Sequence, residues 1–444
     1  MAGLARFLCL DGGAAGKPTP PPTNDGGPLS PTRPGDISAQ RAELFAPGGD
    51  WSALLDPLDA GLRDELLKYG DLAQATYDGF DGRHWSPHCG TCLHGIRRLL
   101  PALGLAGHGY VATAFIYATC DGGGKVPRWI RRQLHAEAWT GHANWIGYVA
   151  VSGAAGHRDI VVAWRGTIAP DEWLLDMRTR MVPFELDAGK DKGARVAMGF
   201  HSIYTSRNAG SRYGGRSARE QVAGELARLV SHFRGRGEAV RVVATGHSLG
   251  GALAQLAARD AAEAHPDVPV AAVTFAAPRV GNRAFCDGLA SRGVRVLRVA
   301  VRHDVVPLVP SVPRVVIDAP VSKALAKLWA VTGRPPSWAY VHAGDELELD
   351  VKRSPFLKHA YDVLGFHNLE TCLHLLDGAG ARRDMALVNK TSGMLRDEER
   401  VPACWYLPEN KGLVRNELGR WVVAEREEDD LPVPDDRLPL SELD

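Results

Sequence analysis

A serine with small neighbours is the most reactive pattern in this chain of 444 residues. Residues 246–250 read Gly-His-Ser-Leu-Gly, with an apolar run at 240–244 before them and a helix-forming run at 251–258 behind them. Between a strand and a helix this spacing predicts a nucleophile elbow, because small residues let the backbone turn sharply and the helix N-terminus offers N–H groups to an oxyanion. The pentapeptide also arises by chance on ordinary connections, but the flanking runs favour an elbow with Ser248 as the nucleophile.

A serine nucleophile needs a base, and the base needs an orienting carboxylate. In α/β hydrolases the acid follows the serine along the chain and the histidine comes last. Asp304 stands just after a strand-like run at 295–301, and open α/β sheets carry their functional residues at the carboxyl ends of strands. We therefore predict Asp304 as the acid, with Asp318 as the second candidate. A turn or capping role is the alternative for Asp304.

The base is harder to select, because several histidines follow the acid. His342, His359, His367 and His374 all lie downstream. His367 occupies a loop-to-helix junction from which a side chain can reach back over a sheet edge. His374 lies further along the same expected helix, where packing or solvent exposure is expected, and His342 lies in a strand-like run that favours a structural role. The residues alone leave His367 and the other three as alternatives.

The oxyanion hole is expected to combine two groups from different loops. The first is the backbone N–H of Leu249, directly after the nucleophile. The second comes from the segment at 163–167, which ends a strand-like run. Gly166 there allows a close backbone approach, and the Thr167 hydroxyl adds a side-chain donor. A plain glycine turn at the end of a strand is the alternative.

An apolar stripe follows this loop in the sequence. Trp173 and Met177 are four residues apart, and Leu174 widens the stripe. A helix packed in the core would explain the pattern. A lid or lipid-contact helix explains it equally well, and the position next to the expected oxyanion hole favours the lid.

The elements that must position these residues alternate between strands and helices. Strand-like runs lie at 144–151, 160–164, 240–244, 269–275 and 295–301, and helical runs lie at 218–234, 251–258 and 281–291. This alternation predicts an α/β fold in which helices flank a mostly parallel central sheet. A further helix is expected from about Asp56 to Tyr77, and residues 78–130 are expected to be loops.

Composition excludes several classes of function. The chain has 52 Lys and Arg against 52 Asp and Glu, so charge provides no general attraction to nucleic acid or to an anionic membrane. No run of 18 or more apolar residues occurs, so no transmembrane segment is expected and any membrane contact is peripheral and hydrophobic. Seven scattered cysteines, an odd number, indicate a reducing, intracellular environment rather than a disulfide framework.

Three regions follow from changes in composition along the chain. Residues 1–48 are rich in Gly and Pro and are expected to be a disordered segment or a targeting leader such as a transit peptide. Residues 49–424 are expected to form the catalytic domain. The acidic tail at 425–444 is expected to extend into solvent.

A Cys-x-x-Cys pattern is formed by Cys89 and Cys92, with His88 and His94 beside it. Such a pattern is typical of half a zinc site or of a redox pair. No second Cys-x-x-Cys exists to complete a four-cysteine site. We therefore favour a structural loop, and we expect neither a metal nor a cofactor.

Beyond single motifs, the chain resembles a known family. Four segments, at 163–167, 245–254, 274–282 and 304–307, are similar to the class 3 (fungal-type) lipases. Three more, at 51–81, 144–151 and 410–412, resemble the plant phospholipase A1 branch of that family. The resemblance covers about residues 51 to 424 and implies the α/β-hydrolase fold.

The resemblance also implies an activity and roles for particular residues. It implies an acylhydrolase acting at the sn-1 ester of membrane glycerolipids, which are phospholipids and in some members galactolipids or triacylglycerols. Ser248 matches the nucleophile, Asp304 the acid and His367 the base, because residues 366–370 resemble the family's histidine segment. Some members release plastid fatty acids for jasmonate synthesis and carry an organellar leader. A chloroplast or mitochondrial location is thus expected, with the cytoplasm as the alternative because the leader contains acidic residues.

Other functions remain as alternatives at this point. The same three residues would serve a carboxylesterase for small soluble esters or a triacylglycerol lipase. Interfacial activation distinguishes a lipid enzyme from an esterase, because only the lipid enzyme gains rate when its substrate forms micelles. A non-catalytic binding module is the third class, and the intact Ser248, Asp304 and His367 argue against it.

Overall fold

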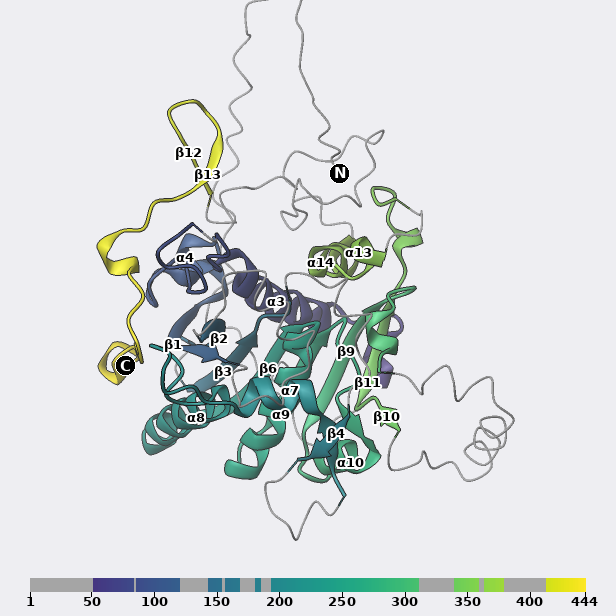
Figure 1. Ribbon diagram of the computed structural model, residues 1–444. Helices are drawn as coiled ribbons and strands as arrows, with labels where there is room; N and C mark the ends of the chain where they lie inside the picture. Colours follow the sequence, from purple (N-terminus) through teal and green to yellow (C-terminus); the bar gives the residue numbers. More distant parts are fainter. Residues whose placement is uncertain are drawn as a thin grey trace, which may run out of the picture. The chain divides into compact units, whose positions relative to one another are not determined.

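The fold is known from a computed structural model that describes residues 51–83, 85–119, 143–153, 156–167, 180–184, 193–310, 339–358, 363–378 and 413–444. The predicted leader at 1–48 lies outside these residues. Within them, a central sheet is covered by helices on both faces (Figure 1). The predicted α/β-hydrolase class, with a mostly parallel sheet, is confirmed.

The central sheet has seven strands in the order β1-β2-β3-β6-β7-β9-β11. Their bounds are Tyr110–Ala118 (β1), Asn144–Ser152 (β2), His157–Trp164 (β3), Ala239–His247 (β6), Val270–Phe275 (β7), Arg295–Val301 (β9) and Asp345–Leu349 (β11). The first three strands pair antiparallel, and β3, β6, β7, β9 and β11 pair parallel. The parallel strands therefore present their carboxyl ends at one common edge, which is the edge where we predicted the functional residues.

Both faces of this sheet are buried, and strand pleating explains how. Successive side chains of a strand point to opposite faces. In β6, Val242 and Ala244 belong to one hydrophobic cluster, while Val243 between them belongs to the other. The near-continuous apolar runs seen in the sequence are the pattern expected of parallel strands covered on both sides.

Two groups of helices supply these covers (Figure 1). One face packs against α3 and α14, and the other packs against α7, α8, α9 and α10. The helix bounds are Ser52–Leu55 (α2), Ala60–Asp78 (α3), Leu99–Ala102 (α4), Met198–Thr205 (α7), Ala218–Gly235 (α8), Leu249–Ala264 (α9), Arg283–Ser291 (α10), Val363–Phe366 (α13) and Leu369–Gly378 (α14). The first long helix begins where the sequence indicated, because the Asp59 carboxylate caps it by accepting from the Leu62 N–H.

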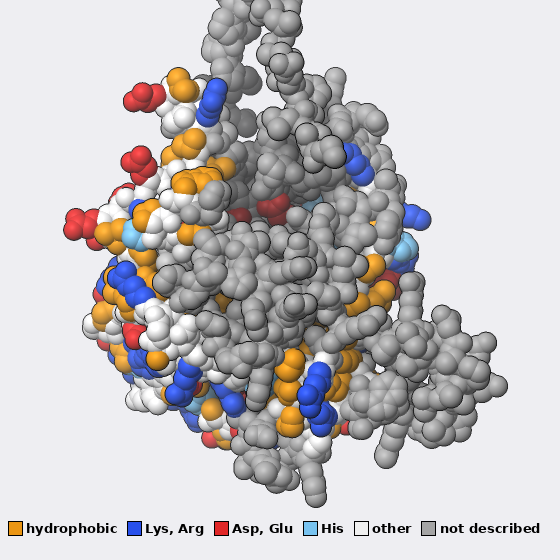
Figure 2. Space-filling view, viewed as in Figure 1, with side chains coloured by type: hydrophobic (Ala, Val, Ile, Leu, Met, Phe, Trp, Pro, Cys, Tyr) orange, Lys and Arg blue, Asp and Glu red, His pale blue; other side chains and the backbone are white. Residues whose placement is uncertain are grey.

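Smaller elements complete the described structure. A four-stranded sheet in the order β10-β8-β5-β4 shares no strand with the central sheet, and a two-stranded hairpin follows later in the chain. The bounds are Met181–Pro183 (β4), Arg195–Ala197 (β5), Gly281–Asn282 (β8), Tyr340–Val341 (β10), Leu413–Arg415 (β12) and Trp421–Val423 (β13). No helix among the described residues is long and apolar enough to cross a membrane. On the face drawn in Figure 2, basic and acidic side chains are interspersed, in keeping with the balanced charge.

The expectation of loops throughout 78–130 was wrong, because residues 110–118 form the edge strand β1. Glycine, proline and histidine clusters around this run dominated the sequence pattern and hid it. The strand itself carries residues suited to a sheet, including Tyr110, Phe115 and Ile116. It pairs antiparallel with β2 through two register shifts, so the buried positions do not follow a simple alternation that a pattern search would find.

The expectation that the tail at 425–444 extends into solvent was also wrong. Leu438 and Leu443 are buried in the core, and the Leu438 N–H donates to the Thr113 carbonyl of β1 over 2.9 Å. Several acidic residues of the tail pair with arginines of the body. The Asp430 carboxylate accepts from the Arg98 guanidinium over 2.9 Å and is itself buried. Net acidity was a poor guide because the matching arginines lie some 300 residues earlier in the chain.

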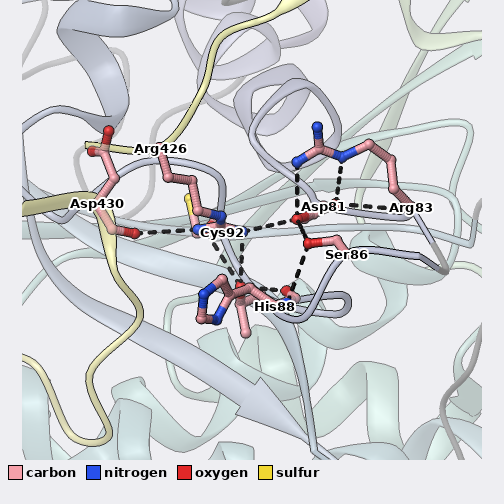
Figure 3. Close-up of polar contacts among 8 residues, drawn as sticks. Asp81, Arg83, Ser86, His88, Cys92, Arg426 and Asp430 are labelled. Carbon is pink, nitrogen blue, oxygen red and sulfur yellow. Dashed lines mark hydrogen bonds and ion pairs between the residues drawn. The ribbon is translucent and has the colours of Figure 1, made fainter. Parts of the chain in front are cut away.

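Arg426 fixes the start of this tail to the loop that follows α3 (Figure 3). Its guanidinium donates to the Asp81 carboxylate over 3.0 Å and to the Thr91 hydroxyl over 3.1 Å. Asp81 also accepts from Arg83 over 2.9 Å and from the Ser86 hydroxyl over 2.7 Å. Burial by itself would raise the pKa of Asp81, but these donors outweigh it and hold that pKa well below its usual range.

The Cys-x-x-Cys segment belongs to this same loop. Arg426 also donates to the Cys92 main-chain carbonyl, so the backbone of this segment, rather than its thiol, makes the contact. Cys89 and Cys92 are both free thiols, and Cys92 is buried. Burial raises the pKa of the Cys92 thiol to about 12, which makes it a poor nucleophile and a poor redox partner at neutral pH.

Replacing Arg426 by Ala should destabilise the fold by about 3 kcal/mol, because Asp81 would keep a buried charge with one partner fewer. Urea unfolding measures this loss. Arg97→Ala is the matched control, since Arg97 also joins the body to the tail, through Glu442, but on the exposed surface. Its stability should equal that of the wild type.

The stability that Arg426→Ala loses should also depend on pH. The pKa of Asp81 is lowered on folding, so its contribution to stability is complete above the unfolded value of about 3.9 and fades as the pH falls below it. The difference in free energy of unfolding between the wild type and Arg426→Ala should therefore become smaller in that acid range. Equal losses for Arg426→Ala and Arg97→Ala at neutral pH would contradict this account of the tail.

Candidate active site

Ser248 stands on the turn that joins β6 to α9. Its backbone has φ 56° and ψ −126°, a region that residues with a side chain rarely adopt. The side chain is only 1% exposed. The predicted sequence of strand, serine and helix is present, and the positive φ is the strain expected at such a turn.

Glycine is required on both sides of Ser248 because the chain packs against itself there. A methyl group on Gly246 would collide with the Gly250 carbonyl group and lie 2.9 Å from the Gly251 nitrogen. One on Gly250 would collide with the end of β3, 2.8 Å from the Trp164 carbonyl carbon. The G-x-S-x-G spacing is thus required because neither glycine position has room for a side chain. It brings the end of β3 within contact distance of the turn.

His367 lies between Ser248 and Asp304 and bonds to both. Its Nε2 is 2.8 Å from the Ser248 Oγ, and its Nδ1 is 2.8 Å from the Asp304 Oδ2. Because the carboxylate accepts, Nδ1 carries the proton, and Nε2 is left to accept the serine hydroxyl proton. All three side chains are buried. The structure therefore brings together the serine, acid and histidine selected from the sequence.

Asp304 reaches this position from the carboxyl end of β9. His303 before it has a φ of 74°, which turns the chain sharply after the strand. The second carboxylate oxygen of Asp304 accepts from the Val306 N–H over 2.9 Å. One oxygen thus fixes the loop while the other faces His367. The capping contact that we gave as the alternative role exists as well, on the same side chain.

The other histidines that the structure describes have different partners. His342 donates from Nε2 to the Pro307 carbonyl over 2.7 Å, and burial lowers its pKa to about 3. The His374 Nε2 is 2.7 Å from the Ser354 hydroxyl, and burial lowers its pKa to about 4. Several predicted residues lie outside the described part of the chain: His359, Asp318, Trp173, Leu174 and Met177.

The segment after β3 forms the second wall of the site. A methyl group on Gly166 would collide with the Tyr77 hydroxyl and lie 3.1 Å from the Ser248 Cβ, so this loop runs directly beside the serine. The Thr167 Oγ1 is buried and has no hydrogen-bond partner among the residues that the structure describes. Leu249 opens α9, where helix N–H groups lack partners within the helix. The two segments that carry the predicted oxyanion donors thus meet beside Ser248.

Sequence reasoning gave no role to Arg165, which anchors this wall. Its guanidinium is buried, stacks 3.8 Å above the centre of the Phe80 ring and donates to the Trp145 carbonyl over 3.2 Å. The signal that the sequence offered is a charged residue inside the expected oxyanion segment, directly after an apolar run. Its contacts hold the backbone that leads into Gly166.

No group of three or more His, Cys, Asp or Glu side chains within the described ranges is arranged to hold a metal ion. A polarised serine hydroxyl, a histidine base with a carboxylate behind it and two donors beside the serine are the parts needed for acyl transfer.

Comparison with known proteins agrees with this geometry. The class 3 lipase family model matches residues 161–313, which contain Ser248 and Asp304. Phospholipase A1-Igamma1, chloroplastic, from Arabidopsis thaliana is 40% identical over 89% of this chain and 80% of its own length. Phospholipase A1-II 6 from Oryza sativa subsp. japonica is 40% identical over 89% of this chain and 97% of its own length. The chain belongs to the class 3 lipase family, in the branch of the plant phospholipases A1.

The predicted enzyme class, a lipase-type hydrolase of carboxylic esters, is confirmed by these relatives. Among solved structures, a triacylglycerol lipase from Penicillium expansum aligns with a TM-score of 0.42 and 17% identity, over 66% of this chain and 81% of that one.

Substituting Gly166 by Ala should damage both activity and stability. The added methyl would meet the Tyr77 hydroxyl and lie 2.6 Å from the His247 carbonyl oxygen, and such overpacking costs about 1–3 kcal/mol. A displacement near 1 Å beside the nucleophile costs about 100-fold in rate. Labelling of Ser248 by a fluorophosphonate probe measures the rate effect. Gly215→Ala is the control, since a methyl there meets no atom within 4 Å; equal labelling of both variants would refute the steric account.

Proposed function

We propose that this chain is a phospholipase A1, which cleaves the sn-1 acyl ester of membrane glycerolipids with Ser248 as nucleophile, His367 as base and Asp304 as orienting acid. The observation that supports it most directly is the continuous hydrogen bonding from Ser248 through His367 to Asp304. The relatives support the substrate class, since several are named as phospholipases A1.

In the acylation step, the Ser248 Oγ attacks the ester carbonyl carbon while its proton moves to the His367 Nε2. The carbonyl π electrons move to the oxygen, which becomes the oxyanion of a tetrahedral intermediate. The intermediate collapses by breaking the bond to the glycerol oxygen, and His367 returns its proton to that oxygen. The 2-acyl lysolipid leaves, and the acyl group stays on Ser248. Asp304 stabilises the imidazolium that exists between the two proton transfers.

Deacylation repeats these steps with water. His367 takes a proton from a water molecule whose oxygen attacks the acyl carbon, and the second intermediate expels the Ser248 oxygen with that proton. The fatty acid is released and the enzyme is restored. In both steps the Thr167 hydroxyl and the Leu249 N–H donate to the oxyanion. The lack of another partner for Thr167 Oγ1 among the described residues supports this role, because that donor remains available for the reaction.

The stripe of Trp173, Leu174 and Met177 is proposed as the lipid-contact segment, on its sequence alone. It begins a few residues after Thr167 in the sequence. Peripheral contact of this kind gives a membrane enzyme access to its substrate without a transmembrane segment.

A chloroplast location is proposed for the chain, with residues 1–48 as the leader. Three relatives, phospholipases A1-Igamma1, -Igamma2 and -Igamma3 from Arabidopsis thaliana, carry the word chloroplastic in their names, and their names support a plastid over a mitochondrion. Fatty acids released from plastid lipids would feed jasmonate synthesis.

The positional assay tests the activity. Phosphatidylcholine with different acyl chains at sn-1 and sn-2 should lose the sn-1 chain, and Ser248→Ala should reduce the rate on the order of 10⁶-fold. The rates of hydrolysis of galactolipid and triacylglycerol, measured in parallel, distinguish a broad lipase from a phospholipase. Release of the sn-2 chain, or wild-type turnover by Ser248→Ala, would refute the proposal. Hydrolysis of soluble esters alone would favour a carboxylesterase.

Thr167→Val tests the oxyanion role with a side chain of the same shape. Removing one oxyanion donor should lower kcat about 100-fold and leave KM nearly unchanged, because the donor acts on the transition state. Thr167→Ser keeps the hydroxyl and should retain most of the activity. A Thr167→Val enzyme with the kcat of the wild type would exclude the hydroxyl from the oxyanion hole.

A further inference from the structure

A single hydroxyl group connects the three segments that build the site. Tyr77, in the last turn of α3, places its Oη 2.7 Å from the His247 Nδ1. The same oxygen lies against the Gly166 main chain, next to Thr167, so closely that a methyl group on Gly166 would collide with it. On the far side of its ring, the His247 Nε2 is 2.9 Å from the main-chain carbonyl oxygen of His367. This close contact and the two hydrogen bonds thus form one continuous path from the oxyanion loop through the nucleophile turn to the base.

The partners determine the direction of each of these hydrogen bonds. A carbonyl oxygen can only accept, so the His247 Nε2 carries the ring proton and donates it to His367. The His247 Nδ1 is then the acceptor, and the Tyr77 hydroxyl donates to it. Tyr77 therefore donates to the nucleophile turn and packs against the oxyanion loop. His247 has a single tautomer that suits both of its neighbours.

We propose that Tyr77 and His247 are positioning residues for the proposed acyl transfer, holding the main chain of His367 and the Gly166–Thr167 loop at a fixed spacing around Ser248. This inference rests on the proposed function of the same site. Neither residue touches the reacting atoms in this scheme. Each acts through the backbone of a residue that does.

The charge of His247 fits the role. Its ring centre lies 4.7 Å from that of His367, and His367 must become positively charged during each half of the reaction. Burial lowers the pKa of His247 well below its usual value, and the neighbouring His367 lowers it further. His247 thus remains neutral and does not oppose the imidazolium beside it. The Tyr77 proton at Nδ1 occupies the position where a second proton would bind.

A purely structural role for the Tyr77 hydroxyl is poorly supported, because α3 is anchored elsewhere. The Tyr148 hydroxyl donates to the Leu72 carbonyl over 2.7 Å. The Thr245 hydroxyl donates to the Tyr69 carbonyl over 3.2 Å, and the Tyr69 hydroxyl donates to Asp159 over 2.7 Å. The helix keeps these contacts without Tyr77. Within the described residues, the hydrogen bond of the Tyr77 hydroxyl lies at the site.

Tyr77→Phe against Tyr148→Phe separates positioning from stability. Each variant removes one buried hydroxyl that bonds α3 to the sheet or its loops. Both should lower the melting temperature to a similar degree. With a soluble p-nitrophenyl ester, Tyr77→Phe should lower kcat about tenfold to thirtyfold with KM within about twofold, somewhat less than the 100-fold cost of a 1 Å displacement. Tyr148→Phe should keep the kcat of the wild type.

Two substitutions of His247 test the direction of the path. His247→Gln places an amide N–H₂ near the position of Nε2 and can still donate to the His367 carbonyl. His247→Asn places an amide oxygen near Nδ1 and can only accept from Tyr77. The Gln variant should therefore retain more kcat than the Asn variant. The proton resonance of the His367 Nδ1–H bonded to Asp304 should stay nearer its wild-type position in the Gln variant.

The outcomes distinguish this inference from the function on which it rests. A wild-type chain that hydrolyses no ester and takes no fluorophosphonate would overturn the proposed function. Two results with an active wild type would overturn the positioning role alone. One is a Tyr77→Phe variant with the kcat of the wild type, and the other is an equal loss of kcat in Tyr77→Phe and Tyr148→Phe. Equal kcat and equal His367 resonances in the Gln and Asn variants would overturn the assigned direction of the hydrogen bonds.

Discussion

The close packing of backbone around Ser248 is the constraint on which the rest of the site depends. Neither Gly246 nor Gly250 has room for a methyl group, and Ser248 between them adopts a positive φ. Such a turn is stable only where its surroundings impose it. Here β3, β7 and α9 do so, since the Ser248 N–H donates to the Phe275 carbonyl over 2.9 Å and Gly250 packs on the end of β3. The strain is thus distributed over the core of the sheet.

The parallel pairing of the central strands follows from this arrangement and brings the functional groups together. β3, β6 and β9 end at the same edge, and each is followed by one part of the site: Thr167, Ser248 and Asp304. The third member of the Ser248–His367–Asp304 set, His367, comes from elsewhere. It enters from the turn before α14, a helix that packs beside α3 on one face of the sheet.

The parts that sequence reasoning found are those tied to strand ends. Ser248 and Asp304 can be predicted from the sequence because each follows an apolar run at a turn, and the two stand in the order expected along the chain. His367 is not readable in this way, because its place depends on packing 119 residues away from Ser248; the family resemblance identified it. β1 and the tail were missed for the same reason, since bulged pairing and tail–body ion pairs are long-range. The link from Tyr77 to His247 spans 170 residues and follows from no local pattern.

Two sets of contacts hold the oxyanion loop, and they have different effects. On one side, the tail residue Arg426 bonds to Asp81, whose neighbour Phe80 stacks under the Arg165 guanidinium. On the other side, the Tyr77 hydroxyl meets the Gly166 main chain. The first path is a chain of buried charge and stacking that resists unfolding. The second combines a close contact with the directed hydrogen bond from Tyr77 to His247, and it sets the spacing of the loop from the nucleophile turn. Because both end on residues 165–166, a loop that a serine hydrolase needs to keep rigid gains stability from the tail and its exact spacing from α3.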